Sequence, residues 1–356
     1  MTVHVDRPRP IWLEPWPQAG LEDLGACPVC GGGERTLFLD DLVDDVFHAA
    51  RGRWTSHRCA TCTNVYLDPR PNAETIGDAY ATYYTHETSV DASSQGRSSF
   101  LRKIYKGAGT LYVQGRFHRS SLFARSLSAM IGGLLFPLAA RESFKHRWLP
   151  RARPGARLLD IGCGNGKFLS VARQDGWSVS GIDLDERALA VARAAGHSVQ
   201  QGTVADLSPD HFGTYDAVTI SHVIEHVPDP LSDIQQAFRL LRPGGFLYVE
   251  TPNIDALGAQ EFGARWRGME APRHLVLFSR SGLQALIARA GFERINFKRR
   301  LLYGDLYKNS AEIERDFLAL SGEQSHRRFT RKQRLRGWIA PSARLEFLTV
   351  TARRPG

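Results

Sequence analysis

The fold is most constrained by a short apolar run that leads directly into closely spaced glycines, Arg157-Leu-Leu-Asp-Ile-Gly-Cys-Gly-Asn-Gly-Lys-Phe-Leu169. The apolar run predicts a buried strand. Glycine lets the backbone turn sharply and approach a ligand, because it has no Cβ. The helix expected next presents free N–H groups and the positive end of its dipole. The segment therefore predicts a nucleotide-type cradle at the mouth of a parallel sheet.

The spacing of the glycines separates two classes of ligand. A dinucleotide site uses G-x-G-x-x-G, whereas here the third glycine comes one residue early and Lys167 stands where that pattern needs glycine. The pattern D-x-G-x-G-x-G resembles that of the class I S-adenosylmethionine-dependent methyltransferases. The resemblance implies that the loop wraps the methionine end of the cofactor, with Asp160 near its amino group.

Four further segments continue the alternation of strands and helices. They are Ser178–Asp183, Ser198–Thr203, Tyr215–Ser221 and Phe246–Thr251. A carboxylate after the second strand suits the ribose diol. The resemblance spans about Pro154 to Phe297 with a final strand near Glu346 to Ala352, and it implies an α/β fold with a Rossmann-like, doubly wound sheet. The predicted cofactor-binding residues are Asp160, Gly162, Gly164, Gly166, Asp183, Leu184, Asp206 and Ser221.

Two C-x2-C pairs near the N-terminus predict a small zinc-binding module. Each pair fits a tight turn that directs two thiolates at one point, and two turns complete a tetrahedral site. The predicted ligands are Cys27, Cys30, Cys59 and Cys62. A closed four-sulfur site has no open position for water, so the zinc is expected to be structural. The alternative is four unrelated buried cysteines.

The order of segments predicts residues 1–20 as a flexible tail, 21–72 as the zinc module, 73–150 as a helical linker or lid, and 151–356 as the methyltransferase domain, with an insertion at about 301–344. The zinc pairs, Asp68-Pro-Arg-Pro71 and Tyr80-Ala-Thr-Tyr-Tyr84 together resemble bacterial methyltransferases of glycan and secondary-metabolite biosynthesis. In that resemblance Tyr83 and Tyr84 are expected to fold over the cofactor or the substrate; the alternative is that they pack as ordinary aromatic residues.

Two clusters at the expected carboxyl edge of the sheet carry the candidate chemistry. In His222-Val-Ile-Glu-His226 the positions i, i+3 and i+4 share a helical face, and histidine is the usual general base. The alternatives are a divalent metal held by His and Glu and a structural role at the start of a helix. In the second cluster, Trp266 is expected to stack on the acceptor, Arg273 to bind its phosphate or carboxylate, and His274 to act as a base or as a buried polar residue.

Charge and composition limit the partners. The net charge is +9, and the segment from Arg294 to the end holds 15 Lys and Arg against 6 Asp and Glu, so it carries the whole excess. No nucleic-acid-binding motif accompanies this run, which makes a nucleic-acid partner the less favoured interpretation. No stretch reaches the ~20 apolar residues of a membrane span and no signal peptide is evident. We expect a cytoplasmic protein and leave peripheral membrane contact and the oligomeric state open.

These features predict methyl transfer from S-adenosylmethionine to a small-molecule or glycan-type acceptor, with a hydroxyl as the first choice. Methylation of an isoprenoid or lipid-linked acceptor is the alternative suggested by the apolar segment between Phe100 and Arg147. A zinc-containing nucleic-acid-binding protein with a degenerate methyltransferase fold is the alternative from another class.

Overall fold

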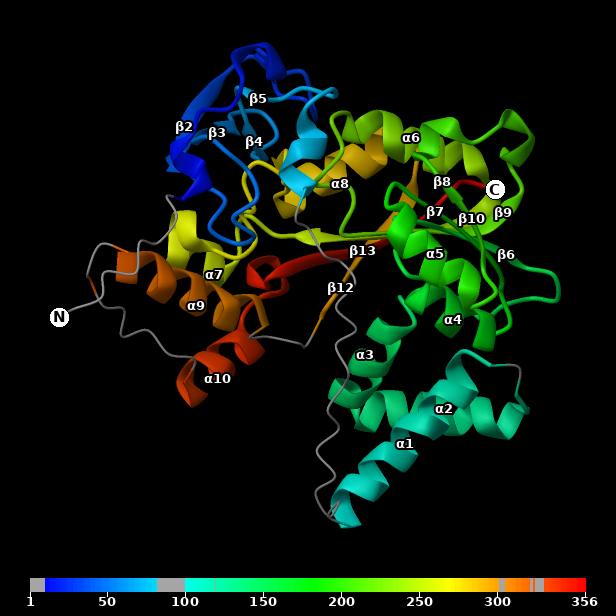
Figure 1. Ribbon diagram of the computed structural model, residues 1–356. Helices are drawn as coiled ribbons and strands as arrows, with labels where there is room; N and C mark the ends of the chain where they lie inside the picture. Colours follow the sequence, from blue (N-terminus) through cyan, green and yellow to red (C-terminus); the bar gives the residue numbers. More distant parts are fainter. Residues whose placement is uncertain (1–9, 82–99, 119, 301–304, 321–322, 324–329) are drawn as a thin grey trace.

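The computed structural model describes the chain except residues 1–9, 82–99, 119, 301–304, 321–322 and 324–329 (Figure 1). Its centre is a seven-stranded sheet in the order β12-β13-β10-β9-β6-β7-β8. The strands are β6 (Arg157–Ile161), β7 (Ser178–Asp183), β8 (Ser198–Gln201), β9 (Tyr215–Ser221), β10 (Leu241–Pro252), β12 (Glu293–Lys298) and β13 (Phe347–Arg353).

The first five of these strands are parallel, and β13 is inserted antiparallel between β10 and β12. The strand order reverses between β6 and β9, which is where open α/β sheets bind their ligands. The predicted doubly wound sheet is confirmed.

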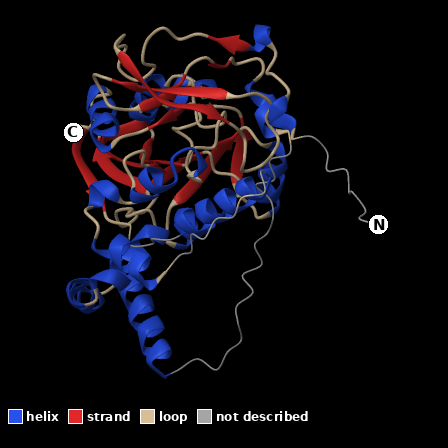
Figure 2. Cartoon of the chain, turned by 90° about the vertical axis from the view of Figure 1, so that its left-hand side faces the viewer, coloured by secondary structure: helices blue, strands red, loops and turns tan. Residues whose placement is uncertain are grey.

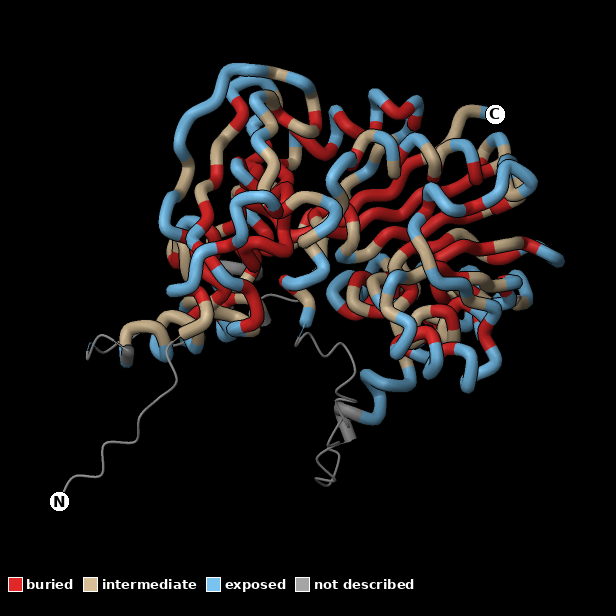
Figure 3. Tube along the Cα trace, turned by 45° about the horizontal axis from the view of Figure 1, so that its top comes forward, coloured by how far each residue is buried: buried red, intermediate tan, exposed pale blue. Residues whose placement is uncertain are grey.

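Alternate residues of the central strands face two separate apolar layers, as a sheet covered on both faces requires. Leu159, Val218 and Leu247 pack in the layer beneath α6 (Pro230–Leu240) and α8 (Arg280–Arg289). Leu158 and Ala217 pack in the layer beneath α4 (Lys167–Gln174) and α5 (Glu186–Ala194). Figure 3 shows these strands as the buried centre of the molecule.

Strand boundaries differ from the sequence prediction at two places. The strand predicted at Phe246–Thr251 extends from Leu241 to Pro252 as β10, whose register shifts between Leu241 and Phe246, where Gly244 takes a φ of 72°. The third strand ends at Gln201 rather than at Thr203, because Thr203 caps the short helical turn Val204–Asp206 instead.

The N-terminal region forms a second sheet, in the order β11-β4-β3-β2, from β2 (Arg35–Leu42), β3 (Trp54–Cys59), β4 (Val65–Leu67) and β11 (Val276–Leu277). Strand β11 comes from the region of the chain after β10, yet it pairs with β4 of the N-terminal region. The cysteine-bearing region and the region of the central sheet therefore share one hydrogen-bonded sheet. Short strands β1 (Leu21–Glu22) and β5 (Arg70–Pro71) pair beside it.

The segment predicted as helical forms α1 (Phe100–Arg116), α2 (Leu122–Leu134) and α3 (Phe136–Lys145). These helices project from the side of the molecule that carries α4 (Figures 1 and 2). The late insertion contains α9 (Asp305–Leu320) and α10 (Arg331–Ile339), which lie near α7 (Leu257–Phe262). Within the described residues no single helix is long and apolar enough to cross a membrane, and the bent pair α2–α3 passes that test by length and composition only.

Candidate functional site

The glycine loop after β6 adopts the conformation that its sequence predicts. Gly162, Gly164 and Gly166 have φ values of 71°, 51° and 76°, which residues with a Cβ rarely adopt. A Cβ on Gly162 would lie 2.1 Å from the side chain of Val223, whereas a Cβ on Gly164 would project into open space. The first glycine therefore allows the segment after β9 to pack closely, and the second leaves room for a ligand beside the loop.

Two carboxylates flank this loop. The Asp183 carboxylate accepts hydrogen bonds from the Gly164 N–H at 2.8 Å and the Asp185 N–H at 2.9 Å, so it fixes the loop at the end of β7. Asp160 is buried, and one of its oxygens accepts from Arg147 and from Thr219. Burial raises the pKa of Asp160 although Arg147 opposes the effect. Its other oxygen, Oδ2, is buried with no hydrogen-bond partner among the described residues.

That unsatisfied oxygen and the open space at Gly164 test whether the site fits S-adenosylmethionine. A buried carboxylate oxygen without a donor is costly, and the ammonium of a methionine moiety is a suitable donor for it. The residues therefore fit the methionine end of the cofactor.

The remaining predicted cofactor residues lie along the same edge. Leu184 is exposed directly after Asp183. Asp206 is exposed, and hydrogen bonds from Thr203 lower its pKa. Ser221 ends β9 opposite Glu250. The structure brings these residues to the carboxyl edge of the sheet, and their contacts with the cofactor remain predictions.

His222 lies between two carboxylates. Its Nε2 is 3.2 Å from Glu250 and its Nδ1 is 3.5 Å from Glu225, while its ring meets Phe347 edge-on. Burial works against the charged imidazole, but the two carboxylates outweigh it and raise the pKa of His222 to about 9. The side chain is 42% exposed. At neutral pH His222 is therefore an accessible cation. Both of its ring nitrogens are protonated, so the side chain cannot act as a general base.

His226 and His274 form the deeper part of the cluster, with their rings 4.7 Å apart. His226 Nδ1 lies 3.0 Å from the Arg273 carbonyl and 3.0 Å from the Tyr80 hydroxyl. His274 Nδ1 lies 2.7 Å from the Gly268 carbonyl. Burial lowers the pKa of His226 and, more strongly, that of His274. Both rings are therefore neutral at physiological pH.

The same cluster offers a metal-binding geometry. Glu225, His226 and His274 each present one ligand atom, and the three atoms lie within 4.8 Å of one another. Nitrogen and carboxylate ligands suit several divalent transition metals. The structure is therefore compatible with the divalent-metal site that the sequence analysis gave as an alternative.

The predicted acceptor-binding role of Trp266 and Arg273 needs correction. Trp266 is 1% exposed and donates its indole N–H to Glu346 at 2.9 Å. Arg273 is fully buried and forms two hydrogen bonds with Asp44, at 2.7 and 3.0 Å. Neither side chain presents a surface to an acceptor, because each is already part of the packed interior. Tyr83 and Tyr84 lie outside the described residues.

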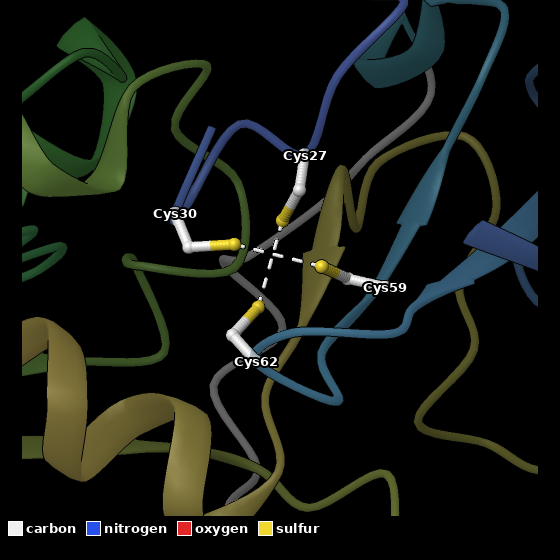
Figure 4. Close-up of side chains that lie close together, drawn as sticks. All are labelled: Cys27, Cys30, Cys59 and Cys62. Carbon is white, nitrogen blue, oxygen red and sulfur yellow. Dashed lines mark hydrogen bonds between the residues drawn. The ribbon is translucent and has the colours of Figure 1, made fainter. Parts of the chain in front are cut away.

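The four N-terminal cysteines converge as their spacing predicts (Figure 4). The sulfurs of Cys27 and Cys62 are 3.6 Å apart, and those of Cys30 and Cys59 are 3.5 Å apart. Zinc–sulfur bonds of about 2.3 Å in a tetrahedron imply sulfur–sulfur edges of about 3.8 Å. The cluster thus has nearly the size of a zinc-thiolate site, and Gly31, with a φ of 78°, forms the first turn. Zinc itself remains a proposal.

Three site residues were missed by the sequence analysis. Arg147 reaches Asp160 from the segment before β6, and its guanidinium lies 3.6 Å from the centre of the Phe168 ring. Glu250 faces His222 from β10, and Tyr80 bonds His226 from the N-terminal region. Glu250 and Tyr80 could have been suspected, since one ends a predicted strand and the other belongs to a tyrosine cluster. Nothing in the sequence near Arg147 indicates its partner.

Comparisons with known proteins identify the family of the chain. A family model described as a methyltransferase domain matches residues 137–296. A ubiquinone biosynthesis O-methyltransferase from Bordetella avium is 32% identical over 176 residues, which cover 44% of this chain and 71% of that protein. Enzymes of the same name from Thiobacillus denitrificans and Xanthomonas campestris pv. campestris strain B100 are 39% and 41% identical, over 34% and 29% of this chain.

The matches cover 55% and 45% of the latter two relatives, so the chain spans about half of their length. The region that the family model matches contains the glycine loop, the Asp183 carboxylate and the His222–His226 segment described above. With these residues in place and the sheet order given above, the chain belongs to the class I S-adenosylmethionine-dependent methyltransferases.

Proposed function

We propose that this chain transfers the methyl group of S-adenosylmethionine to a hydroxyl oxygen of a small organic acceptor. The observation that carries the proposal is the histidine cluster at the carboxyl edge of β9, which the close packing of Val223 against Gly162 places beside the glycine loop. The sulfonium of the cofactor supplies an electrophilic methyl group. The names of the relatives, all O-methyltransferases of ubiquinone biosynthesis, support an oxygen acceptor.

Within the cluster, His226 is the proposed general base. A carbonyl oxygen can only accept, so the bond to Arg273 requires a proton on His226 Nδ1 and leaves Nε2 free to take one. The neutral ring is the form that accepts a proton, and burial keeps the pKa of His226 low. The cationic His222, held by Glu225 and Glu250, is suited to stabilise a developing oxyanion instead.

The proposal is tested with radiolabelled cofactor, a panel of phenols, catechols and sugars, and mass spectrometry of the product. His226→Ala should lose turnover about 10²–10⁴-fold with unchanged affinity for S-adenosylhomocysteine. His211→Ala, a histidine outside the cluster that contacts Tyr215, is the control. Normal turnover by His226→Ala on an accepted substrate would remove His226 as the base, and methylated nitrogen or carbon would exclude the hydroxyl assignment.

A second candidate role for the cluster is a divalent metal site that polarises the hydroxyl, favoured by the convergence of Glu225, His226 and His274. Dialysis against a chelator separates the two. Loss of turnover that Mg²⁺ restores, in protein that elemental analysis shows to keep the zinc of the cysteine cluster, supports the metal, and turnover unaffected by the chelator supports His226 alone.

A lipid-linked or isoprenoid acceptor is the second candidate substrate class. It is favoured by the exposed apolar residues of α2, including Leu122, Phe123 and Leu134. Activity that depends on detergent or liposomes would support this class, and equal activity on water-soluble acceptors would argue against it.

A further inference from the structure

One nitrogen of the proposed base His226 faces two oxygen atoms from other segments of the chain. Its Nδ1 lies 3.0 Å from the Arg273 carbonyl oxygen and 3.0 Å from the Tyr80 hydroxyl oxygen. The centres of the His226 and Tyr80 rings are 6.2 Å apart. Because a carbonyl oxygen can only accept, the proton must be on Nδ1, where the Tyr80 oxygen can accept it as well. The two oxygens therefore favour the tautomer that leaves Nε2 unprotonated.

Tyr80 belongs to the N-terminal region, where it ends the short helical turn Ile76–Tyr80. The preceding residue, Ala79, is fully buried, and its carbonyl accepts a hydrogen bond from Arg273 Nη1 at 3.0 Å. The peptide next to Tyr80 is thus bonded to the same arginine whose own carbonyl accepts from His226. These contacts form a closed ring between the N-terminal region and the candidate catalytic edge.

The side chain of Arg273 fixes the second oxygen. Its guanidinium is fully buried and donates to Asp44 at 2.7 and 3.0 Å. Asp44 also lies in the N-terminal region, between β2 and β3. Bonds between two ionised groups are strong and have a defined geometry. Both oxygens that meet His226 Nδ1 are therefore positioned by contacts with the N-terminal region.

The backbone beside the histidine cluster is joined to the same region. Leu275, directly after His274, accepts with its carbonyl from the Leu67 N–H of β4 at 3.1 Å. The Leu275 N–H donates to the Glu225 carbonyl at 2.8 Å. A series of backbone hydrogen bonds thus runs from β4 to the residue before His226. The N-terminal region and the loop that carries the proposed base form one hydrogen-bonded unit.

This arrangement has a consequence for proton transfer. As the methyl group passes from sulfur to the acceptor oxygen, the hydroxyl proton of the acceptor goes to His226 Nε2, and the ring becomes a cation. Two oxygens at Nδ1 stabilise that cation and fix the direction of Nε2, as a third group does for a general base in many enzymes. Asp44, Ala79 and Tyr80 lie outside residues 137–296, which match the methyltransferase-domain family model.

We propose that Tyr80 is a positioning residue for methyl transfer, whose hydroxyl oxygen shares the Nδ1 proton of His226 with the Arg273 carbonyl and so holds Nε2 toward the acceptor hydroxyl. The N-terminal region thereby completes the site of the central sheet. The inference rests on the proposed function, because Tyr80 acts through the proposed base.

The first test observes the His226 ring directly and needs no acceptor. The full chain is labelled with ¹⁵N-histidine and saturated with S-adenosylhomocysteine, and His226→Ala identifies the signals of the ring. Nδ1 should give the signal of a protonated nitrogen and Nε2 that of an unprotonated one. Tyr80→Phe removes only the hydroxyl and should shift the Nδ1 signal. Tyr112→Phe, which removes a hydroxyl bonded to Ser143 at 2.7 Å, should leave it unchanged.

The second test measures turnover on the phenol, catechol or sugar that the wild type methylates fastest. Tyr80→Phe should lower kcat about threefold to tenfold, the effect of one hydrogen bond, with unchanged KM for acceptor and cofactor. Tyr112→Phe should keep the wild-type kcat. In the His226→Ala background, Tyr80→Phe should have no further effect, because the two residues act as one unit. Melting temperatures establish that each variant is folded.

The outcomes separate this inference from the proposed function. An unchanged Nδ1 signal in Tyr80→Phe, or a wild-type kcat for Tyr80→Phe while His226→Ala is impaired, would overturn the role of Tyr80 and leave His226 as the base. The same fold loss from Tyr80→Phe with and without His226 would also overturn it, since Tyr80 would then act elsewhere. Normal turnover by His226→Ala would overturn both.

Discussion

Arg273 and Asp44 form a fully buried, two-bond ion pair that joins segments 229 residues apart in the chain. Asp44 also accepts the backbone N–H groups of Phe47, Ala49 and Ala50. One pair therefore fixes both the loop between β2 and β3 and the loop that carries His274. It connects the cysteine-bearing region to the candidate catalytic edge.

Breaking this pair should destabilise the whole fold rather than weaken acceptor binding. Asp44→Asn removes the carboxylate that forms both short hydrogen bonds to the buried Arg273 and leaves a longer contact with the Glu270 carboxylate, 3.6 Å from Arg273 Nε, so we expect a loss of about 3–5 kcal/mol in the free energy of unfolding. Asp41→Asn, which removes the exposed partner of Arg53, should change it by less than about 1 kcal/mol. Urea denaturation measures both, and equal midpoints would contradict the structural role.

The same pair should make the protein sensitive to acid. Burial favours the neutral form of Asp44, but the bonds to Arg273 outweigh it and lower the pKa from 3.8 to about 2. A carboxyl with a lowered folded-state pKa stabilises the fold above its unfolded value and loses that contribution as the pH falls to the folded value. Stability should thus decline from about pH 4 to about pH 2, and Asp44→Asn should reduce the slope in that window.

The raised pKa of His222 predicts a change in stability at alkaline pH. Its pKa is raised from 6.5 to about 9 by Glu225 and Glu250 against the effect of burial. The stabilisation is complete below about pH 6.5 and is lost as the pH rises to about 9. Melting temperatures measured between these values should fall for the wild type and less for His222→Gln. Parallel curves would show that His222 is not the titrating group.

The cysteine cluster should hold about one zinc ion per chain, as elemental analysis of protein purified without chelator would measure. Cys27→Ser should lose the metal and unfold β2–β4 more than it weakens cofactor binding, because a structural zinc contributes directly to folding. Cys163→Ala is the matched control, since Cys163 lies in the glycine loop away from the cluster. Zinc-free protein that melts like the wild type would contradict the assignment.

Local patterns predicted most of the fold because each was complete within a short segment. Spacing within a short segment was enough to predict the glycine loop, the paired cysteines and the strands that end at Asp183 and Ser221. The functions assigned to Trp266 and Arg273 were wrong because their partners, Glu346 and Asp44, lie far away in sequence. Only the folded chain shows that both side chains are buried and already paired. Similarly, the position of His222 in the turn was predictable, whereas its charge depends on Glu250 from another strand.

The most direct test of the account is isothermal titration calorimetry with S-adenosylhomocysteine. The wild type should bind one molecule per chain. Asp183→Ala should bind about tenfold to a hundredfold more weakly, since it loses charge-assisted hydrogen bonds of ~1.5–3 kcal/mol, and Asp210→Ala, an exposed carboxylate outside the loop, should bind normally. Tight binding of NAD in place of S-adenosylhomocysteine, or unchanged affinity in Asp183→Ala, would contradict the cofactor site described here.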